Sequence, residues 1–476
     1  MLFGFDISSM SAWIGSDQYL DYFHRPDSTL QGGITASMSA GSLVGALAAG
    51  FLADRLGRRG ALQAASVVFV VGAALQASAQ NVAHLIVGRV ISGLSIGVTS
   101  SQSCVYLAEL APSQIRGRIV GIQQWSIEWG ILIMYLISYG CVNAIHSPAA
   151  FRISWGVQGV PAIALFVALF FFPESPRWLA QKDRWDECWE VLAHLHGHGD
   201  RNSPVVLTEL EEVKEAARVA AESSSISVQG LFGPDMWKRT LAGCSVQIWQ
   251  QLLGGNVMLS LTSSIIQYVI FLVTTGGILP VVDRVGRRTL LIGGAIICCI
   301  IHFATGGIMA SYGHPVDSID GNDILRWEIG GAPAKAVIAL CYIFVGVYGL
   351  TWAPIGWIYC SEVFPLKYRA VGVGFSAASN WTFNLALAFF VPPAFTNIQW
   401  KTYMIFGTFC AVMTVHIFFT YPETSGKTLE EVDELFASNV PAWRSKNATQ
   451  RFEDRVAAAE KSADIVHQEN RETASA

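Results

Sequence analysis

Long apolar segments recur along the chain, separated by short polar stretches. Each is close to the length that a helix needs to cross a membrane, about 20 residues for a hydrocarbon core of about 30 Å. Six segments precede a charged, helix-prone stretch at 173–238 and six follow it. They lie at 1–15, 31–53, 61–79, 82–108, 119–141, 152–172, 240–261, 264–282, 289–310, 335–360, 370–395 and 401–421. The pattern predicts an all-α polytopic membrane protein with twelve spans.

The positions of the charges predict the domain organisation. Basic residues gather in alternate loops, which is typical of loops that stay in the cytoplasm, so both termini are predicted to be cytoplasmic. We expect an N-terminal transmembrane bundle at 1–172, a cytoplasmic helical linker at 173–238, a C-terminal bundle at 239–421 and a cytoplasmic tail at 422–476. The composition, 52% apolar and 14% charged, excludes an ordinary soluble protein.

The stretch from Leu241 to Val282 contains no charged side chain over 42 residues. Basic residues flank both of its ends, which predicts that it crosses the membrane twice. Two crossings need about 40 residues, so almost none remain for a turn. The same stretch holds a polar cluster of Gln247, Gln250, Gln251 and Asn256.

The two halves of the chain repeat one another, as is common in transporters built from two six-helix bundles. Between Asn256 and Asp283 the second half is 21 residues shorter than the first, because the offset between matching segments falls from 250 to 229. The matching segments are Leu2–Asp6 with Leu252–Asn256, Asp54–Arg59 with Asp283–Arg288, Glu109–Arg116 with Glu362–Arg369, and Pro173–Ser175 with Pro422–Thr424.

Two of these repeats carry carboxylates and arginines on the predicted cytoplasmic side. They have the patterns D-R-x-G-R-R and E-x-x-P-x-x-x-R, and arginine–carboxylate forks suit a network that locks two helix bundles together. We therefore predict an inner gate; the alternative is charge that only sets topology. The candidate residues are Asp54, Arg55, Arg58, Arg59, Glu109, Arg116, Arg118, Asp283, Arg284, Arg287, Arg288, Glu362 and Arg369.

Polar and aromatic residues also lie deep in the predicted spans. Counted from the basic ends, Gln250, Trp357 and Asn380 are each roughly 17 to 18 Å into the membrane, near its midplane. Amides both donate and accept hydrogen bonds, and an indole offers a flat apolar surface, so this set suits a neutral polyhydroxylated ring. The alternative is that these amides only join neighbouring helices.

Taken together, these motifs resemble those of the sugar porters of the major facilitator superfamily, and the chain is most similar to fungal proton-coupled hexose transporters. The motifs are Gly4–Asp6, the two D-R-x-G-R-R copies, and the segments 173–179, 250–256 and 422–431. The resemblance implies two pseudo-symmetric six-helix bundles and transport of a monosaccharide, a hexose such as glucose, by alternating access. It implies sugar contacts from Gln124, Gln250, Gln251, Asn256, Trp357 and Asn380.

Asp6 and Arg89 are ionisable residues inside predicted spans at similar depth, so they can pair. The resemblance implies that an aspartate at the position of Asp6 takes up a proton and couples its entry to that of the sugar. A static ion pair is the alternative, and facilitative uniport stays open.

The chain departs from the family pattern in two places. The first span is too short to cross comfortably and is expected to be clipped, and the seventh and eighth are shortened by the 21 residues missing after Asn256. A sugar sensor or a non-transporting truncated form therefore remains as an alternative function. We expect a monomer in the plasma membrane that contacts lipid and uses no cofactor, metal, nucleic acid or enzymatic chemistry. The residues leave open which sugar is carried.

Overall fold

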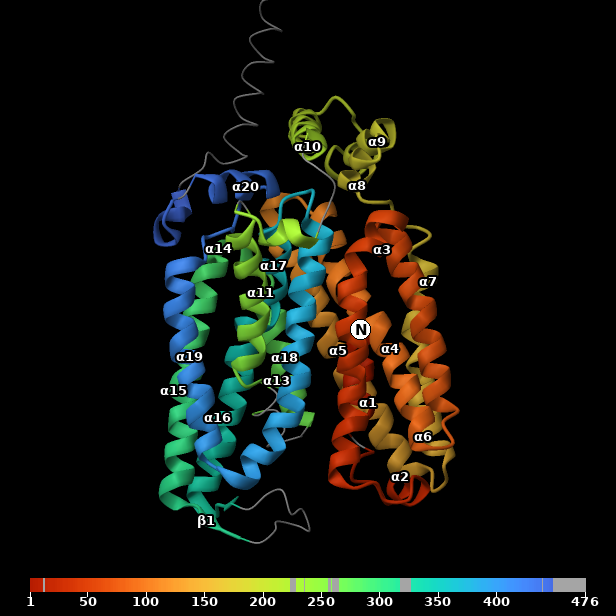
Figure 1. Ribbon diagram of the computed structural model, residues 1–476, viewed down its shortest axis with the longest axis vertical. Helices are drawn as coiled ribbons and strands as arrows, with labels where there is room; N and C mark the ends of the chain where they lie inside the picture. The colour runs from red at the N-terminus through yellow and green to blue at the C-terminus, as the bar shows by residue number, and fades with distance from the viewer. Residues whose placement is uncertain are drawn as a thin grey trace, which may run out of the picture.

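The computed structural model describes residues 1–11, 13–222, 228–234, 236–255, 258, 265–316, 327–438 and 440–447. Most of the helices form two bundles that stand side by side (Figure 1). The first bundle contains α1 (Leu2–Ser9), α2 (Asp17–Tyr22), α3 (Ser28–Ala77), α4 (Val82–Leu110), α5 (Arg116–Ala144), α6 (Ala149–Val157) and α7 (Gly159–Ala168). The second contains α11 (Trp237–Leu252), α13 (Ile265–Ile278), α14 (Val282–Val285), α15 (Arg287–Tyr312), α16 (Gly331–Leu350), α17 (Trp352–Glu362), α18 (Arg369–Asn397) and α19 (Lys401–Thr420).

Small helices cover one end of both bundles, here called the linker face (Figure 1). They are α8 (Pro176–Gln181), α9 (Trp185–His196), α10 (Pro204–Glu222), the 3-10 turns η1 (Ser113–Ile115), η2 (Val228–Phe232) and η3 (Ala442–Asn447), and α20 (Leu429–Ala437). The opposite end, the loop face, carries α2 and a short antiparallel pairing of β1 (His314–Pro315) with β2 (Trp327–Glu328).

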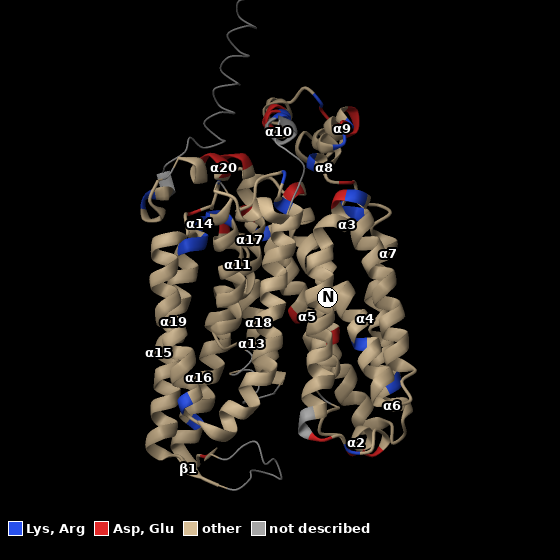
Figure 2. Ribbon diagram, viewed as in Figure 1, with Lys and Arg blue, Asp and Glu red and all other residues tan. Residues whose placement is uncertain are grey.

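The surface of the two bundles is suited to lipid. Charged side chains gather at the two faces, with few along the helices between them (Figure 2). Large apolar side chains point outward at mid-helix; Val273 is 65% exposed and Ile300 is 62% exposed. Seven of the described helices are long and apolar enough to cross a membrane, and one of them, α3, runs through two predicted spans. The prediction of a multi-pass membrane protein is confirmed.

The second and third predicted spans are the two arms of α3, which meet at Gly57. This residue has φ 84° and ψ 166°, a conformation that glycine adopts without steric cost. Ile34 and Ala79, near the two ends, belong to one apolar cluster at the loop face, so the arms run antiparallel. Gly57 therefore makes the turn that the sequence places between the two spans.

Proline breaks two of the predicted spans into two helices each. The sixth is divided between α6 and α7, and the tenth between α16 and α17. Pro161 and Pro354 each lie four residues after the last residue of the preceding helix, where the proline ring clashes with the carbonyl of residue i−4. The break in the tenth span falls at Thr351, with φ −129° and ψ −85°.

The first span is the shortest of the predicted spans as a helix. The sequence predicted it over 1–15, whereas α1 has 8 residues and is followed by turns. Serine hydroxyls there bond to backbone carbonyls: Ser9 Oγ donates to the Asp6 carbonyl at 2.7 Å, and Ser11 Oγ to the Ser8 carbonyl at 2.7 Å. Such bonds compete with the helical pattern at its end.

The seventh and eighth spans are also shorter helices than the sequence predicted. α11 ends at Leu252, close to Gly254, whose φ of 81° does not continue a helix. α13 has 14 residues and ends at Ile278, two residues before Pro280; the residue that precedes a proline is disfavoured in a helix. Residues 256, 257 and 259–264, where the sequence predicted the end of one span and the start of the next, lie outside the described residues.

We predict that Gly57→Ala lowers stability by about 1–2 kcal/mol, because a side chain at positive φ is strained. An added Cβ would also lie 2.2 Å from Oε2 of Glu174. Thermal unfolding of the purified protein in detergent measures the loss. The matched control is Gly293→Ala in α15, where an added Cβ meets nothing within 4 Å and helix propensity favours alanine. Equal melting temperatures for Gly57→Ala and the wild type would contradict the prediction.

Candidate functional site

Side-chain amides from α11 and α18 form a hydrogen-bonded cluster inside the second bundle. Nδ2 of Asn380 donates to Oε1 of Gln247 at 2.8 Å and to Oε1 of Gln250 at 3.0 Å. Its Oδ1 accepts from Nε2 of Gln251 at 3.0 Å. Gln250 and Gln251 follow Gln247 by three and four residues, which places all three side chains on one side of the helix. The structure thus brings together three of the predicted sugar-contacting residues, Gln250, Gln251 and Asn380.

The neighbouring helix α17 supplies backbone acceptors to the same glutamines. Nε2 of Gln250 donates to the Trp352 carbonyl at 3.0 Å, and Nε2 of Gln247 to the Gly356 carbonyl at 3.2 Å. At Gly356 an added Cβ would lie 2.8 Å from Nε2 of Gln250, so a side chain there would displace this amide. Trp357, another of the predicted sugar-contacting residues, is next to Gly356 on α17 and is buried.

The cluster continues across the gap between the bundles. Asn384 donates from Nδ2 to Oε1 of Gln251 at 3.3 Å and accepts at Oδ1 from Ser39 Oγ of α3 at 2.7 Å. The sequence analysis singled out neither residue. The helical period could have found Asn384, one turn after Asn380, but nothing in the sequence marks Ser39, because the packing of α3 against α18 decides its partner.

Gln124 belongs to a second polar group, on α5 of the first bundle. Its Nε2 donates to Oε1 of Glu128 at 3.1 Å, and the same oxygen accepts from Thr275 Oγ1 of α13 at 2.8 Å. Among the described contacts, none joins Gln124 to the amides of α11 and α18. The remaining predicted sugar contact, Asn256, lies outside the described residues.

Asp6 and Arg89 lie together in the first bundle, both almost fully buried. Nη1 of Arg89 is 3.4 Å from Oδ1 of Asp6. The guanidinium also donates to Ser9 Oγ at 3.2 Å and to the Ile34 carbonyl at 3.0 Å. Arg89 has three partners that stabilise its buried positive charge, a carboxylate, a hydroxyl and a carbonyl. Among the described residues, Arg89 is the cation that compensates the negative charge of Asp6.

At the linker face each bundle contains the same buried fork. In the first bundle, Arg58 donates from Nε and Nη2 to Glu109 at 3.1 and 3.4 Å. In the second, Arg287 donates from the same two nitrogens to Glu362 at 3.2 and 2.8 Å. The aspartate one turn before each arginine adds a further ion pair, 3.2 Å for Asp54 and 2.9 Å for Asp283.

A glutamate from outside each helix pair caps the backbone beside these arginines. Glu174 accepts from the amide nitrogens of Arg58 and Arg59 at 3.0 and 3.2 Å. In the second bundle Glu423 accepts from the amides of Arg287 and Arg288, at 2.8 and 3.2 Å. The second arginine of each pair bonds a carbonyl near the end of the last predicted span of its own bundle: Arg59 to Phe172 at 3.1 Å and Arg288 to Phe418 at 2.8 Å. The sequence repeat is thus a repeat of hydrogen bonds.

Different contacts join the two bundles at the linker face. Asp283 accepts from the amide nitrogens of Gly117 and Arg118, each at 2.9 Å, which places a carboxylate of the second bundle at the first turn of α5. Nη1 of Arg369 lies 3.7 Å from Oε1 of Glu109. Arg116 donates from Nη1 to the Lys427 carbonyl at 3.0 Å.

The predicted gate residues therefore fall into overlapping groups, and Arg59 and Arg288 bond carbonyls of their own bundles beside the forks. The two forks lie within their own bundles, where we had expected them to lock one bundle to the other; the reason is that each buried arginine needs a carboxylate fixed close by in the same bundle. Asp283, Arg116, Arg118, Arg369 and Glu109 make the contacts between the bundles. Arg55 and Arg284 are exposed and form no ion pair with the described part of the chain.

The linker helices add a further tie between the halves. Arg177 of α8 contacts Glu430 of α20 at 3.2 and 3.3 Å and donates from Nη1 to the Glu109 carbonyl at 3.0 Å. Burial alone would raise the pKa of Glu430, but Arg177 and Arg369 outweigh it and lower that pKa to about 2. Glu430 is therefore ionised throughout the physiological pH range.

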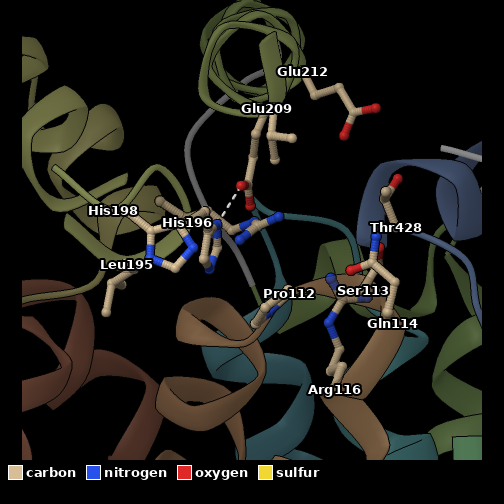
Figure 3. A pocket seen from close by; sticks show the side chains of 12 residues that line it. Pro112, Ser113, Gln114, Arg116, Leu195, His196, His198, Glu209, Glu212 and Thr428 are labelled. Atoms are coloured by element: carbon tan, nitrogen blue, oxygen red, sulfur yellow. Dashed lines mark hydrogen bonds and ion pairs between the residues drawn. The ribbon is translucent and has the colours of Figure 1, made fainter. Parts of the chain in front are cut away.

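A pocket of about 290 Å³ opens beside this tie, between the linker helices, the start of α5 and α20 (Figure 3). His196 and Glu209 both line this pocket and contact each other, with Nδ1 of His196 2.5 Å from Oε2 of Glu209. Nε2 of His196 lies 3.1 Å from the Leu110 carbonyl. Burial opposes the charged imidazole, but the hydrogen bond and charge of Glu209, with the Leu110 carbonyl, together outweigh it and raise the pKa of His196. The pocket lies at the linker face, apart from the amides between the bundles.

Comparison with known proteins agrees with this architecture. A family model described as "Sugar (and other) transporter" matches residues 1–436. A high-affinity glucose transporter of Kluyveromyces lactis is 45% identical over 467 residues, which cover 94% of this chain and 85% of the relative. An MFS glucose transporter of Aspergillus flavus is 43% identical over 478 residues, covering 95% and 90%.

Among solved structures, the fold is similar to that of the proton:xylose symporter XylE bound to 6-bromo-6-deoxy-D-glucose. The TM-score is 0.79 at 24% identity, and the match covers 91% of this chain and 96% of the other. An inward-open structure of XylE from E. coli matches with a TM-score of 0.66 at 26% identity, covering 91% and 96%. The predicted fold, a major facilitator with two helix bundles, is confirmed.

We predict that Asp283→Asn loosens the contact between the bundles at the start of α5. The neutral amide has a single acceptor oxygen, so it loses one of the two bonds to α5 and the charge that strengthens both. Hydrogen exchange of peptides containing Gly117 and Arg118 should rise about tenfold, which corresponds to about 1.4 kcal/mol. Asp21→Asn, at an exposed ion pair with Arg25, is the control and should leave this exchange unchanged. Unaltered exchange in Asp283→Asn would rule out the contact.

Proposed function

This chain belongs to the sugar transporter family, and we propose that it carries a hexose such as glucose across a membrane by alternating access, coupled to a proton. The observation that carries the proposal is the cluster of Gln250, Gln251 and Asn380 inside the second bundle, which Asn384 joins to the first bundle. Its relatives from Kluyveromyces lactis and Aspergillus flavus are named glucose transporters, which supports glucose as the substrate.

The amide cluster has the chemistry that a neutral sugar requires. Each amide both donates and accepts, so a ring of hydroxyls can replace amide–amide bonds one for one. Gln251 and Asn384 are half-buried, and they join the second bundle to Ser39 of the first. We propose that the sugar enters at this junction, replaces these bonds, and contacts Gln250, Asn380 and the indole of Trp357.

Proton coupling is proposed for Asp6 and Arg89. The carboxylate is fully buried and Arg89 is its only cationic partner among the described residues. Protonation of Asp6 removes the attraction between the two groups and releases Arg89 to its remaining partners, Ser9 and Ile34. Because these partners lie on α1 and α3, loss of the pair changes the packing of helices in the first bundle.

We propose that the linker face is cytoplasmic, with both termini on that side, and that the protein is a monomer in the plasma membrane. Basic residues gather at this face (Figure 2). Among those of the predicted cytoplasmic loops, Arg59, Arg118 and Arg288 bond there to Glu174, Asp283 and Glu423 in turn. The contacts of Asp283, Arg369 and Arg177 then form the inner gate, and inward opening of the sugar site requires all three to separate.

Uptake of labelled glucose by cells without their own hexose transporters tests the proposal. We expect saturable uptake and accumulation that a protonophore abolishes. Uptake that is equal with the proton gradient collapsed would show a uniporter, and Asp6 with Arg89 would then be a structural pair. No uptake by correctly located protein would overturn the transport function and favour a sensor or a non-transporting form.

We predict that Asn380→Ala raises the KM for glucose at least tenfold. The substitution removes the centre of the cluster and leaves the amides of Gln247, Gln250 and Gln251 without their shared partner. The control is Asn397→Ala on the same helix, where an exposed asparagine donates to the Pro393 carbonyl of its own helix at 2.9 Å. Initial uptake rates, corrected for the amount of protein at the cell surface, give KM for each variant. A wild-type KM in Asn380→Ala would exclude it from the sugar site.

For Asp6→Asn we predict loss of proton-driven accumulation with retention of glucose exchange. An amide cannot take up the proton, but it is close to the carboxylate in size and leaves the helices packed. Accumulation with and without a protonophore, and exchange of labelled for unlabelled glucose in preloaded vesicles, measure the two properties. Asp21→Asn, at the exposed pair with Arg25, should accumulate glucose as the wild type does. Protonophore-sensitive accumulation by Asp6→Asn would contradict a coupling role.

A further inference from the structure

Glu128 is a buried carboxylate in the middle of α5 that the transport mechanism above does not use. It is 2% exposed and lies one helical turn after Gln124. Counted along the helix from Arg116 at the linker face, it is roughly 18 Å into the bundle, the depth of the sugar-contacting amides. A carboxylate at this depth is costly to bury, so its contacts must account for its presence.

Both hydrogen bonds of Glu128 go to one oxygen, Oε1. This oxygen accepts from Nε2 of Gln124 at 3.1 Å and from Oγ1 of Thr275 at 2.8 Å. Thr275 also contacts the Gly349 carbonyl at 3.2 Å, close to the end of α16. Glu128 therefore connects α5 of the first bundle to α13 and α16 of the second.

The bond to Gln124 fixes how this amide is presented. A side-chain amide has a donor end and an acceptor end, and Glu128 engages the donor end. The carbonyl oxygen of Gln124 is consequently turned away from Glu128 and is available to a hydroxyl donor. Without Glu128 the amide could rotate, and half of its orientations would present the wrong group.

No ion pair accounts for Glu128. No arginine, lysine or histidine in the described part of the chain lies within ion-pair distance of it, in contrast to Asp6, Glu109 and Glu362, and its second oxygen, Oε2, has no hydrogen-bond partner there. A carboxylate with one half unsatisfied contributes little to stability. A stabilising role in the first bundle therefore does not explain it, whereas a role through Gln124 and Thr275 does.

Neighbouring contacts show that the seam between α5 and α13 is continuous. Trp125 donates from Nε1 to the Leu272 carbonyl at 3.1 Å, and the rings of Tyr135 and Tyr268 lie 5.2 Å apart. On α5, Glu128 lies between Trp125 and Tyr135, and on α13, Thr275 follows Leu272 by three residues. These contacts hold Gln124 at a fixed position relative to the second bundle, which contains the other amides of the site.

We propose that Glu128 is the positioning residue of the sugar site. It orients Gln124 so that the side-chain carbonyl of Gln124 accepts a hydrogen bond from a hexose hydroxyl. Its bond to Thr275 also fixes the position of α5 relative to α13. The inference rests on the proposed hexose transport. It assigns to Glu128 an effect on sugar affinity that acts through Gln124.

Two substitutions of Glu128 separate positioning from packing. Glu128→Leu removes both bonds at similar volume, and we expect the KM for glucose to rise about tenfold with Vmax per transporter within about threefold of wild type. Glu128→Gln keeps an acceptor oxygen for both partners and should restore KM to within about twofold of wild type. The control Ser138→Ala, on the same helix, loses a buried bond to Ser154 of the same bundle at 2.9 Å and should not change KM.

A double-variant cycle tests whether Glu128 acts through Gln124. If it does, Glu128→Leu combined with Gln124→Ala has the same KM as Gln124→Ala alone. A wild-type KM in Glu128→Leu, or an additive effect of the two substitutions, would overturn the inference. Where Glu128→Leu does not reach the membrane, Glu128→Asp replaces it: the shorter side chain withdraws the acceptor, so a raised KM supports the inference and an unchanged KM overturns it.

The wild type distinguishes this inference from the function on which it rests. If the wild-type protein takes up no hexose, the proposed function fails and the role of Glu128 fails with it. If the wild type transports glucose but its KM is indifferent to Glu128, the transport function stands and only the positioning role is overturned.

Discussion

The structure depends on the rule that a charge buried at the edge of a membrane must have its partner at hand. Arg58 with Glu109 and Arg287 with Glu362 satisfy this rule within each bundle, and Glu174 and Glu423 bind the backbone beside the two arginines. Removing one member would leave an uncompensated buried charge, which costs several kcal/mol. Each bundle can therefore move with its fork intact, because the two members of the fork neutralise each other within the bundle.

Contacts between the bundles have a different character. Asp283 with the start of α5, Arg369 with Glu109 and Arg177 with Glu430 cross from one half to the other, and each can separate while the internal forks remain. Separation at the linker face thus costs a few charge-assisted hydrogen bonds and takes buried Arg369 away from Glu109, but it leaves both forks intact. Strong ion pairs within each bundle and separable contacts between the bundles suit a molecule that alternates between two open states.

The polar groups near the middle of the bundles follow the same logic with neutral chemistry. The amides of Gln247, Gln250, Gln251 and Asn380 satisfy one another without a ligand, so the site is not left with unpaired groups in the membrane. In the proposed function a sugar exchanges its hydroxyls for these bonds, so the orientation of every amide affects binding. Glu128 fits this picture as the group that sets the orientation of Gln124.

The sequence by itself determined the membrane class, the positions of most spans and the repeat, because these follow from hydrophobic length and from charge at the ends. The internal repeat also identified the residues of both forks, but it did not show that each arginine pairs with a glutamate of its own bundle. Only the tertiary structure decided the partners: Ser39 for Asn384, Thr275 for Glu128, and the α5 amides for Asp283. These residues are more than 100 positions apart in the chain, and the packing of one bundle on the other, which no local pattern encodes, brings them within hydrogen-bonding distance.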